Sequence, residues 1–310
     1  MSSQTTELLW APSEARKRSA HISAYTAWLA QDTGLEFVRY DDLWQWSVDH
    51  LEDFWASIWR YFDVASTRPY TRVLSHARMP GARWFEGARI NFVDQVFRHR
   101  ALTAPAIVFE SEAAGQGEMS WGELEQQVAA LAETLRALGD DPGDRVAAYL
   151  PNVPQAVVAF LAVASIGAIW SVCAPEMGQV SVRDLFIQIE PKVLIACDGY
   201  RFGGKAFDRR DVLREVLDSL PSVESVIWVP HLDRETDAAS ICGGRKWLAW
   251  SDAVAGDARL KCATGLGIHL ALSRPESGEV LHRQHHLRTV GCNDQSRRHS
   301  HGDCRALSRR

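Results

Sequence analysis

Apolar side chains recur every three or four positions in the segment 43–62, "LWQWSVDHLEDFWASIWRYF". This spacing lines one face of an α-helix, because residues three and four apart are neighbours on a helix surface. The pattern predicts one amphipathic helix whose apolar face packs on the main body of the protein. Its apolar members are Trp44, Val48, Leu51, Trp55, Ile58, Trp59 and Phe62.

Short apolar runs alternate with helical patterns between residues 101 and 263. "DRVAAYL" precedes "PQAVVAFLAVASIG", "AIWSVC" precedes "VSVRDLFIQIE", "KVLIAC" precedes "DRRDVLREVLDSL", and "VESVIWV" comes last. Strands that are apolar on both faces and alternate with helices are typical of a parallel sheet covered by helices. We therefore expect an α/β fold, a mostly parallel sheet flanked by helices, preceded by a helical Trp-rich region.

One helix in this part has clear start and stop signals, in "SWGELEQQVAALAETLRALG". Ser120 stands at the N-cap position, and Glu123 three residues later completes a capping box. Gly139 follows the last periodic residue and marks the end of the helix.

Composition narrows the class of protein. With 310 residues, 46% hydrophobic and 24% charged, the chain is typical of a soluble globular protein. A formal net charge of −5 argues against a generally basic nucleic-acid binder. We expect no signal peptide and no membrane span, and the six scattered cysteines favour reduced thiols and a cytoplasmic location.

The last part of the chain, residues 264–310, differs from the rest. It has no aromatic residue and no lysine, but it holds six of the eleven histidines. Eight arginines against four acids give it a formal charge of +4, which leaves −9 for residues 1–263. Without large apolar side chains such a segment cannot offset the entropy of ordering, so we expect disorder.

The segment 197–211, "CDGYRFGGKAFDRRD", collects four cations just after the apolar run "KVLIA". Guanidinium groups suit phosphate oxygens, and Gly203 and Gly204 permit a close approach of the backbone. The alternative is a solvated turn whose charges bind nothing, which is common for surface charges. The four cations are Arg201, Lys205, Arg209 and Arg210.

Several long strings carry a family resemblance. They are "LWQWSV", "FWASIWRYF", "MPGARWFEGARINFVD", "DRVAAYLPNVPQAVVAFLAVASIGAIWSVCAPEMG" and "IEPKVLIACDGYRFGGKAFDR". In this order they resemble the acetoacetyl-CoA synthetases, which are adenylate-forming acyl-CoA synthetases. The resemblance implies a helical N-terminal region in residues 1–100 and part of the AMP-binding large domain in 101–263. It also implies acetoacetate, ATP and CoA as substrates, with Mg²⁺, in an acid–thiol ligase reaction.

The resemblance also assigns binding residues. Arg201 matches an arginine that meets CoA phosphates in related enzymes, with Gly203 and Gly204 beside it and Lys205 as a second contact. Glu176, in "WSVCAPEMG", would stand in the wall of the CoA channel. Cys173 in the same string is expected to be a buried small side chain and not a nucleophile, because free cysteines are usually buried and inert.

Family members carry a Ser/Thr/Gly-rich phosphate loop of the kind "YSSGTTGLPK" shortly after the region reached here at residue 263. No string in the chain matches this loop, so we assign no catalytic residue and no metal ligand. We expect the 310-residue chain to be catalytically incomplete, and a change of reading frame near residue 264 would explain the unusual composition of 264–310.

The alternative is a non-catalytic protein that binds CoA or a metal ion and uses the last segment for the metal or a partner. Histidine and cysteine side chains can hold zinc, although this spacing matches no known zinc module. A nucleic-acid-binding arm is disfavoured because aromatic residues for base stacking are absent. The ligands for such a metal would be His282, His285, His286, Cys292, His299, His301 and Cys304.

Overall fold

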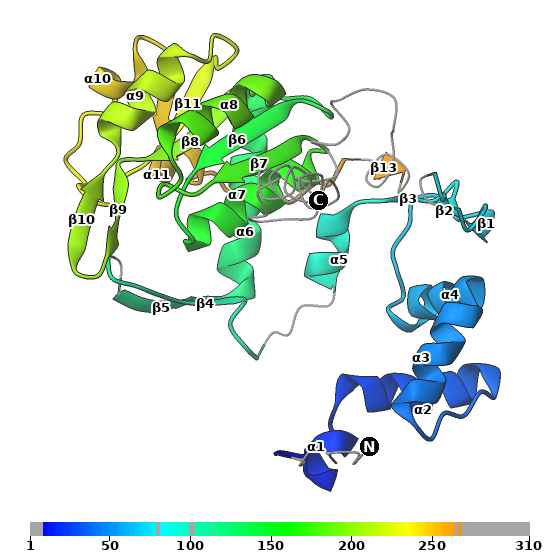
Figure 1. The fold of residues 1–310 in the computed structure, drawn as a ribbon. Helices are drawn as coiled ribbons and strands as arrows, with labels where there is room; N and C mark the ends of the chain where they lie inside the picture. The colour runs from blue at the N-terminus through cyan, green and yellow to red at the C-terminus, as the bar shows by residue number, and fades with distance from the viewer. Residues whose placement is uncertain (1–8, 79–80, 99–102, 114, 264–265, 268–310) are drawn as a thin grey trace, which may run out of the picture.

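A five-stranded parallel sheet forms the centre of the protein (Figure 1). The computed structural model describes residues 9–78, 81–98, 103–113, 115–263 and 266–267. The strands lie in the order β12-β11-β8-β6-β7, and every neighbouring pair is parallel. They are β6 (Arg145–Tyr149), β7 (Ile169–Cys173), β8 (Val193–Cys197), β11 (Ser225–Val229) and β12 (Lys246–Ala249).

Helices cover both faces of this sheet. Alternate strand residues enter opposite cores: in β6, Val146 and Ala148 join one core, and Ala147 and Tyr149 join the other. The first face carries α5 (Phe92–Arg98), α6 (Trp121–Ala137), α7 (Pro154–Ser165) and α11 (Trp250–Ala253). The second carries α8 (Gln179–Ile189), α9 (Arg210–Asp218) and α10 (Ala239–Cys242).

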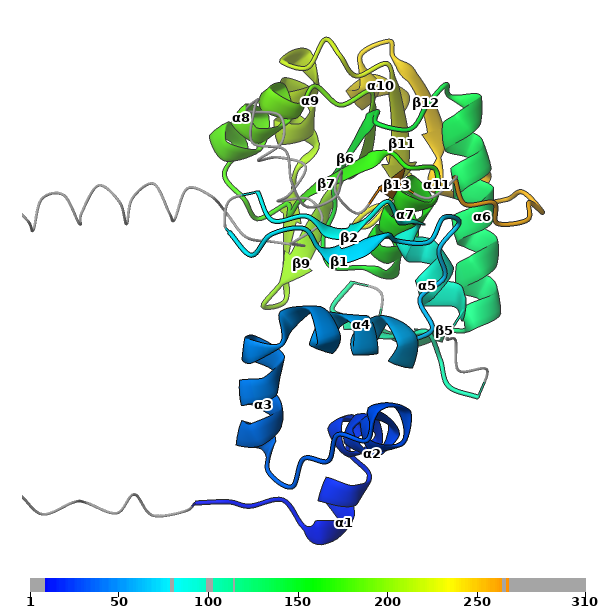
Figure 2. The same cartoon turned by 90° about the vertical axis from the view of Figure 1, so that its right-hand side faces the viewer.

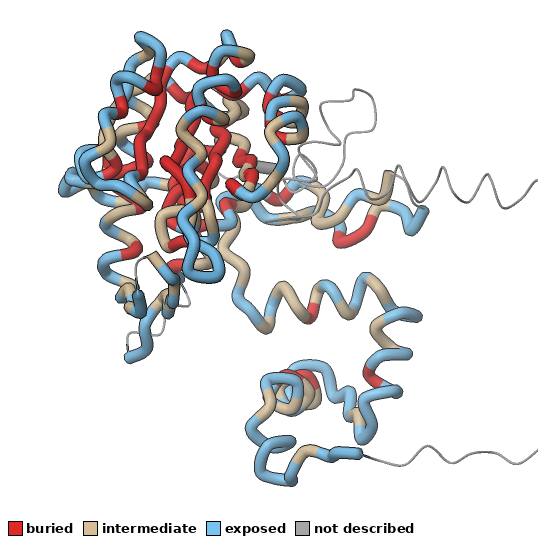
Figure 3. Tube along the Cα trace, turned by 60° about the vertical axis from the view of Figure 1, so that its left-hand side comes forward, coloured by how far each residue is buried: buried red, intermediate tan, exposed pale blue. Residues whose placement is uncertain are grey.

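The expected parallel sheet flanked by helices is confirmed. Every residue of β8 and β11 is buried, as their continuous apolar runs predict for strands covered on both faces. Figure 3 shows the buried residues concentrated in this sheet and sparse in the first helices of the chain. The sequence prediction missed β12, a four-residue edge strand with two exposed positions.

The capping signals of α6 are also confirmed. The Ser120 hydroxyl accepts a hydrogen bond from the Glu123 backbone N–H at 3.2 Å, and the Glu123 carboxylate accepts one from the Ser120 N–H at 2.8 Å. Gly139 has φ +88°, the left-handed conformation that glycine adopts after a helix end.

In the described part of the chain, four helices precede the first strand: α1 (Glu14–Arg18), α2 (His21–Thr33), α3 (Tyr40–Asp49) and α4 (Leu51–Tyr61). The single helix predicted over 43–62 is therefore wrong, because the chain breaks at His50, whose φ of −120° and ψ of 58° are not helical. In a continuous helix, Trp46 and Phe54 would lie about 12 Å apart along the axis. The break brings their ring centroids to 5.9 Å and turns α4 away from α3 (Figure 2).

The first helices form a small core of their own instead of packing on the five-stranded sheet. Its buried members are Tyr25, Leu29 and Leu43, with aromatic side chains packed around them. The prediction that the tryptophan face packs on the main sheet is wrong as stated. Trp44 stays 53% exposed, because the aromatic residues that close this core come from the other side of α3 and α4.

The tryptophans of α4 pack on a small hairpin, formed by β1 (Arg72–Leu74) and β2 (Trp84–Glu86). The Trp55 and Trp84 rings lie 5.7 Å apart, and the Trp59 and Phe85 rings 4.5 Å apart. Aromatic pairs at this separation contribute beyond the area that they bury. The hairpin is therefore the surface that the tryptophan face covers.

Three further strand pairs complete the described structure, and one of them, β9 (Gly199–Phe202) with β10 (Lys205–Asp208), belongs to the candidate site described below. β4 (Ile107–Ser111) pairs antiparallel with β5 (Gly115–Met119), and β3 (Arg89–Ile90) with β13 (Leu266–Gly267). Of the segment expected to be disordered, the structure describes only Leu266–Gly267, which form β13. The alternative metal ligands lie outside the described residues. No helix in the described ranges has the length and apolar character that crossing a membrane requires.

Candidate functional site

The carboxyl ends of β6, β7 and β8 meet at one edge of the sheet, because these strands are parallel neighbours. The chain leaves β6 for α7 on one face and leaves β8 for α9 on the other. Where the connections after two neighbouring parallel strands leave on opposite faces of the sheet, a crevice opens between them. Ligands of open α/β sheets bind in this crevice. The predicted site segment 197–211 follows β8 directly and therefore lies at this edge.

The segment 197–211 forms a β-hairpin where the sequence predicted only a loop. β9 (Gly199–Phe202) pairs antiparallel with β10 (Lys205–Asp208), and the turn consists of Gly203 and Gly204 alone. These glycines have φ of +59° and +74°. Two consecutive positive φ angles define the tight hairpin turn that suits the strand twist, and glycine adopts them without strain.

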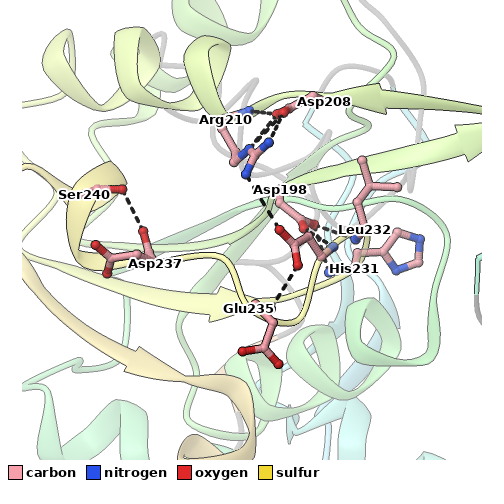
Figure 4. A network of polar contacts seen from close by, with 9 residues as sticks. Asp198, Asp208, Arg210, His231, Leu232, Glu235, Asp237 and Ser240 are labelled. Carbon is pink, nitrogen blue, oxygen red and sulfur yellow. Dashed lines mark hydrogen bonds and ion pairs between the residues drawn. The ribbon is translucent and has the colours of Figure 1, made fainter.

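The base of this hairpin is fixed by a buried carboxylate. Asp198 is 1% exposed and accepts hydrogen bonds from the backbone N–H groups of His231, Leu232 and Asp233, at 2.8, 2.8 and 2.7 Å. Figure 4 shows the Asp198 side chain directed at this segment after β11. Three charge-assisted bonds satisfy the buried carboxylate and join the hairpin to the neighbouring connection.

Gly199 lets the two segments approach closely at the same point. Its φ is +152°, and a Cβ atom there would lie 2.2 Å from the Phe207 carbonyl oxygen and 2.6 Å from the Leu232 side chain. The Leu232 methyl group can move aside, but the Phe207 carbonyl is backbone and leaves no room for a Cβ atom. Glycine is therefore required at position 199 for steric reasons.

Two of the four cations serve the hairpin itself. Arg209 donates from Nε to the Pro175 carbonyl at 2.8 Å and lies 5.4 Å over the Tyr200 ring, which stacks on Phe207 at 4.9 Å. Arg210 donates to the Asp208 carboxylate at 2.8 and 3.1 Å (Figure 4). These contacts explain both arginines as parts of the scaffold.

Arg201 and Lys205 lie at the tip and are exposed. Among the residues that the structure describes, neither side chain has a hydrogen-bond or ion-pair partner, whereas both backbones belong to the β9–β10 ladder. The register pairs Lys205 with Phe202 and Arg201 with Ala206. Because paired residues share a face and successive residues alternate, the two cations emerge on opposite faces. The hairpin therefore does not aim both cations at one point, and the role of Lys205 as a second contact to CoA stays a prediction.

The backbone of the tip holds an anion from the protein itself. The Glu112 carboxylate, from the connection between β4 and β5, accepts hydrogen bonds from the N–H groups of Gly203 and Gly204, at 2.9 and 2.8 Å. These bonds, from Gly204 first and then Gly203, lower the pKa of Glu112, and the nearby charge of Arg201 adds to the effect. The two amides and Arg201 thus form a small anion-binding arrangement.

The segment after β7 borders the same edge. The Pro175 carbonyl accepts a hydrogen bond from the Tyr149 hydroxyl at 3.0 Å, besides the bond from Arg209, and the next residue, Glu176, is exposed. The expectation that Cys173 is a buried small side chain agrees with the structure. It is 2% exposed, and burial raises its pKa to about 12, so the nucleophilic thiolate does not form near neutral pH.

Sequence reasoning missed two residues of this site. Asp198 directly follows a buried strand, a position where a polar residue indicates a role at the sheet edge. Glu112 stands 91 residues before Gly203, and no local pattern connects them. Only the three-dimensional structure brings this carboxylate to the glycine turn.

Comparison with known proteins agrees with this architecture. Residues 93–257 match the family of AMP-binding enzymes, and residues 40–96 match the acetyl-coenzyme A synthetase N-terminus. A solved structure of an acetoacetyl-CoA synthetase from Streptomyces lividans is similar, with a TM-score of 0.76 and 43% sequence identity. That similarity covers 83% of this chain and 39% of the Streptomyces chain.

Curated relatives carry the same name. The acetoacetyl-CoA synthetase of Gallus gallus is 37% identical over 238 residues, which are 74% of this chain and 35% of the relative. The acetoacetyl-coenzyme A synthetase of Rhizobium meliloti (strain 1021) is 35% identical over 237 residues, 76% of this chain and 36% of the relative. The chain thus spans about a third of the length of these relatives.

Proposed function

Because the chain belongs to the AMP-binding enzymes, we propose that it forms the CoA-facing part of an acetoacetate–CoA ligase. Such a ligase converts ATP, acetoacetate and CoA into AMP, diphosphate and acetoacetyl-CoA. Support for this substrate comes from the relatives, which are named acetoacetyl-CoA synthetases and match about three quarters of the chain. A cytoplasmic location fits the four cysteines that remain free thiols in the described part of the chain.

The observation that carries the proposal is the tip of the β9–β10 hairpin. Arg201 presents an exposed guanidinium beside the two amides of Gly203 and Gly204, which already hold a carboxylate. A planar guanidinium and paired N–H groups are the donors that bind phosphate oxygens in proteins. The tip therefore fits a phosphate group of CoA, and the carboxyl edge of the sheet is where such a ligand is expected.

Other residues at this edge receive lesser roles in the proposal. Glu176 would border the path of CoA, because it is exposed on the segment that Arg209 joins to the hairpin base. Lys205 emerges on the other face of the hairpin from Arg201, so it would meet a different group of the ligand or only solvent. Neither Glu176 nor Lys205 takes part in bond making or bond breaking in this proposal.

ATP and Mg²⁺ belong to the proposed reaction through the family. No string of the sequence matches the Ser/Thr/Gly-rich loop that would hold the ATP phosphates, so we derive no step of adenylation from these residues. The catalytic incompleteness expected from the sequence remains a prediction. Reading the gene after codon 263 in all three frames tests it, because an intact phosphate loop in another frame would support a change of reading frame.

The CoA role is tested in a repaired enzyme, in which an intact adenylation domain follows residue 263. Arg201→Ala should raise the KM for CoA about ten- to hundred-fold, because one charge-assisted phosphate contact is lost. Acetoacetate-dependent exchange of diphosphate into ATP should stay near the parent level, since adenylation precedes the entry of CoA. Arg234→Ala, at another exposed arginine, serves as the matched control.

Two outcomes would contradict the proposal. One is an unchanged KM for CoA in Arg201→Ala. The other is an equal loss in diphosphate exchange and in thioester formation, which would indicate general damage to the enzyme.

A further inference from the structure

Glu112 occupies the backbone amides that the proposed CoA site would offer to a phosphate. Its Oε1 and Oε2 atoms accept one hydrogen bond each, from the N–H groups of Gly203 and Gly204. Glu112 belongs to the separate β4–β5 hairpin, which Figure 1 shows below the tip of the β9–β10 hairpin. The contact therefore joins the tips of two hairpins that are far apart in the sequence.

The Glu112 carboxylate occupies the donors that a phosphate anion would use. Two successive N–H groups in a glycine turn form a concave donor pair that binds carboxylates and phosphates alike. Arg201, in β9 two residues before Gly203, adds a positive charge that acts on the Glu112 carboxylate electrostatically. A phosphate oxygen and a carboxylate oxygen require the same two hydrogens, so both anions cannot use the pair together.

The exposure of Glu112 makes the contact reversible. The Glu112 side chain is exposed, so moving it away uncovers no core and leaves no buried charge. Exposed ion pairs and hydrogen bonds of this kind are weak in free energy. A phosphate offers more charge and more acceptor oxygens than a carboxylate, and it can bind Arg201 at the same time.

We propose that Glu112 is an internal anion that holds the Gly203–Gly204 amides in the absence of ligand and is displaced by a phosphate group of CoA. This inference rests on the proposed function, because it takes the ligand to be CoA. Glu112 acts here on ligand binding and not on the reacting atoms. Its displacement would also release the β4–β5 hairpin from the tip of the β9–β10 hairpin.

Two measurements on the 310-residue chain test the inference. Backbone NMR signals of Gly203 and Gly204 report the contact directly, and CoA titration followed by the same signals gives the Kd. Glu112→Gln removes the charge and one acceptor oxygen, while Glu118→Gln makes the same charge change at an exposed position of β5. Arg201→Ala reports separately whether the tip binds CoA at all.

We expect Glu112→Gln to shift both glycine amide signals and to tighten CoA binding about two- to five-fold, because a weak exposed competitor is removed. In the parent chain, CoA should move the same two signals, and Glu118→Gln should leave the signals and the Kd unchanged.

The failures are distinguishable. Suppose that CoA binds the parent chain, that Arg201→Ala weakens this binding, and that Glu112→Gln binds CoA no more tightly than the parent. Glu112 is then a permanent support of the turn, and the proposed displacement is wrong. Glycine signals that do not respond to Glu112→Gln exclude the contact itself. If CoA binds neither the parent chain nor Glu112→Gln, the proposed CoA site fails, and the displacement fails with it.

Discussion

The base and the tip of the β9–β10 hairpin are held in different ways. At the base, Asp198 is buried with three backbone hydrogen bonds, and Gly199 packs where no side chain fits. At the tip, Arg201 is exposed, and a Cβ atom at Gly203 or Gly204 would meet nothing within 4 Å. The base thus has one permitted arrangement, whereas the tip keeps donors that a ligand can use.

This difference separates structural residues from binding residues within one short segment. Arg209 and Arg210 are as cationic as Arg201, but their partners are groups of the protein that shape the hairpin. A rigid support for an exposed group is what a binding site needs, because less freedom is lost when the ligand arrives. The charge of a residue alone would not have distinguished these roles.

The largest expected effect comes from adding one methyl group at the base. Gly199→Ala should lower the free energy of unfolding by about 4 kcal/mol. The added Cβ atom would meet a carbonyl oxygen, and the φ of position 199 is one that alanine rarely adopts. Gly203→Ala, with nothing near its Cβ position, should cost only about 1 kcal/mol for its positive φ. Urea unfolding of both variants measures the contrast, and equal losses would contradict the difference between base and tip.

A smaller effect is expected at the opposite, amino edge of the sheet, where Asp140 is buried without comparable support. It is 3% exposed, and neither carboxylate oxygen has a hydrogen-bond partner among the described residues. Burial raises the pKa of Asp140 to about 6, although the charge of Lys192 opposes the shift. The folded state therefore keeps a proton that the unfolded state loses between about pH 4 and 6, so stability falls as pH rises through this window.

Asp140→Asn removes this loss. Its free energy of unfolding should equal that of the parent chain near pH 4 and exceed it by about 2–3 kcal/mol above pH 7. Asp141→Asn, at the exposed neighbour, should show no such trend. Urea unfolding across the pH range checks both variants. A difference in the free energy of unfolding between Asp140→Asn and the parent chain that does not change with pH would contradict this interpretation.

The sequence predicted the sheet well because its strands and helices have strong local patterns. The apolar runs of β8 and β11 and the capping box of α6 depend on residues close in the chain. The helix break at His50 was missed because it is stabilised by the contact of Trp46 with Phe54, which a helical pattern does not reveal. Periodicity also could not tell which surface the tryptophans cover.

The candidate site was only partly predictable for the same reason. Arg201 and the glycine pair were recognisable from their neighbours in the sequence, and the structure places them together at the expected edge. The opposite facing of Lys205 depends on the two-residue turn, which sets the register of the hairpin. The contact of Glu112 depends on packing between distant hairpins.

The central claim is that the hairpin tip binds a phosphate of CoA through Arg201. Isothermal titration of CoA into the 310-residue chain tests it most directly, with Arg201→Ala compared against Arg234→Ala. The account predicts that Arg201→Ala raises the Kd at least about tenfold while Arg234→Ala leaves it unchanged. A Kd that is the same in the parent chain and in both variants would contradict the claim.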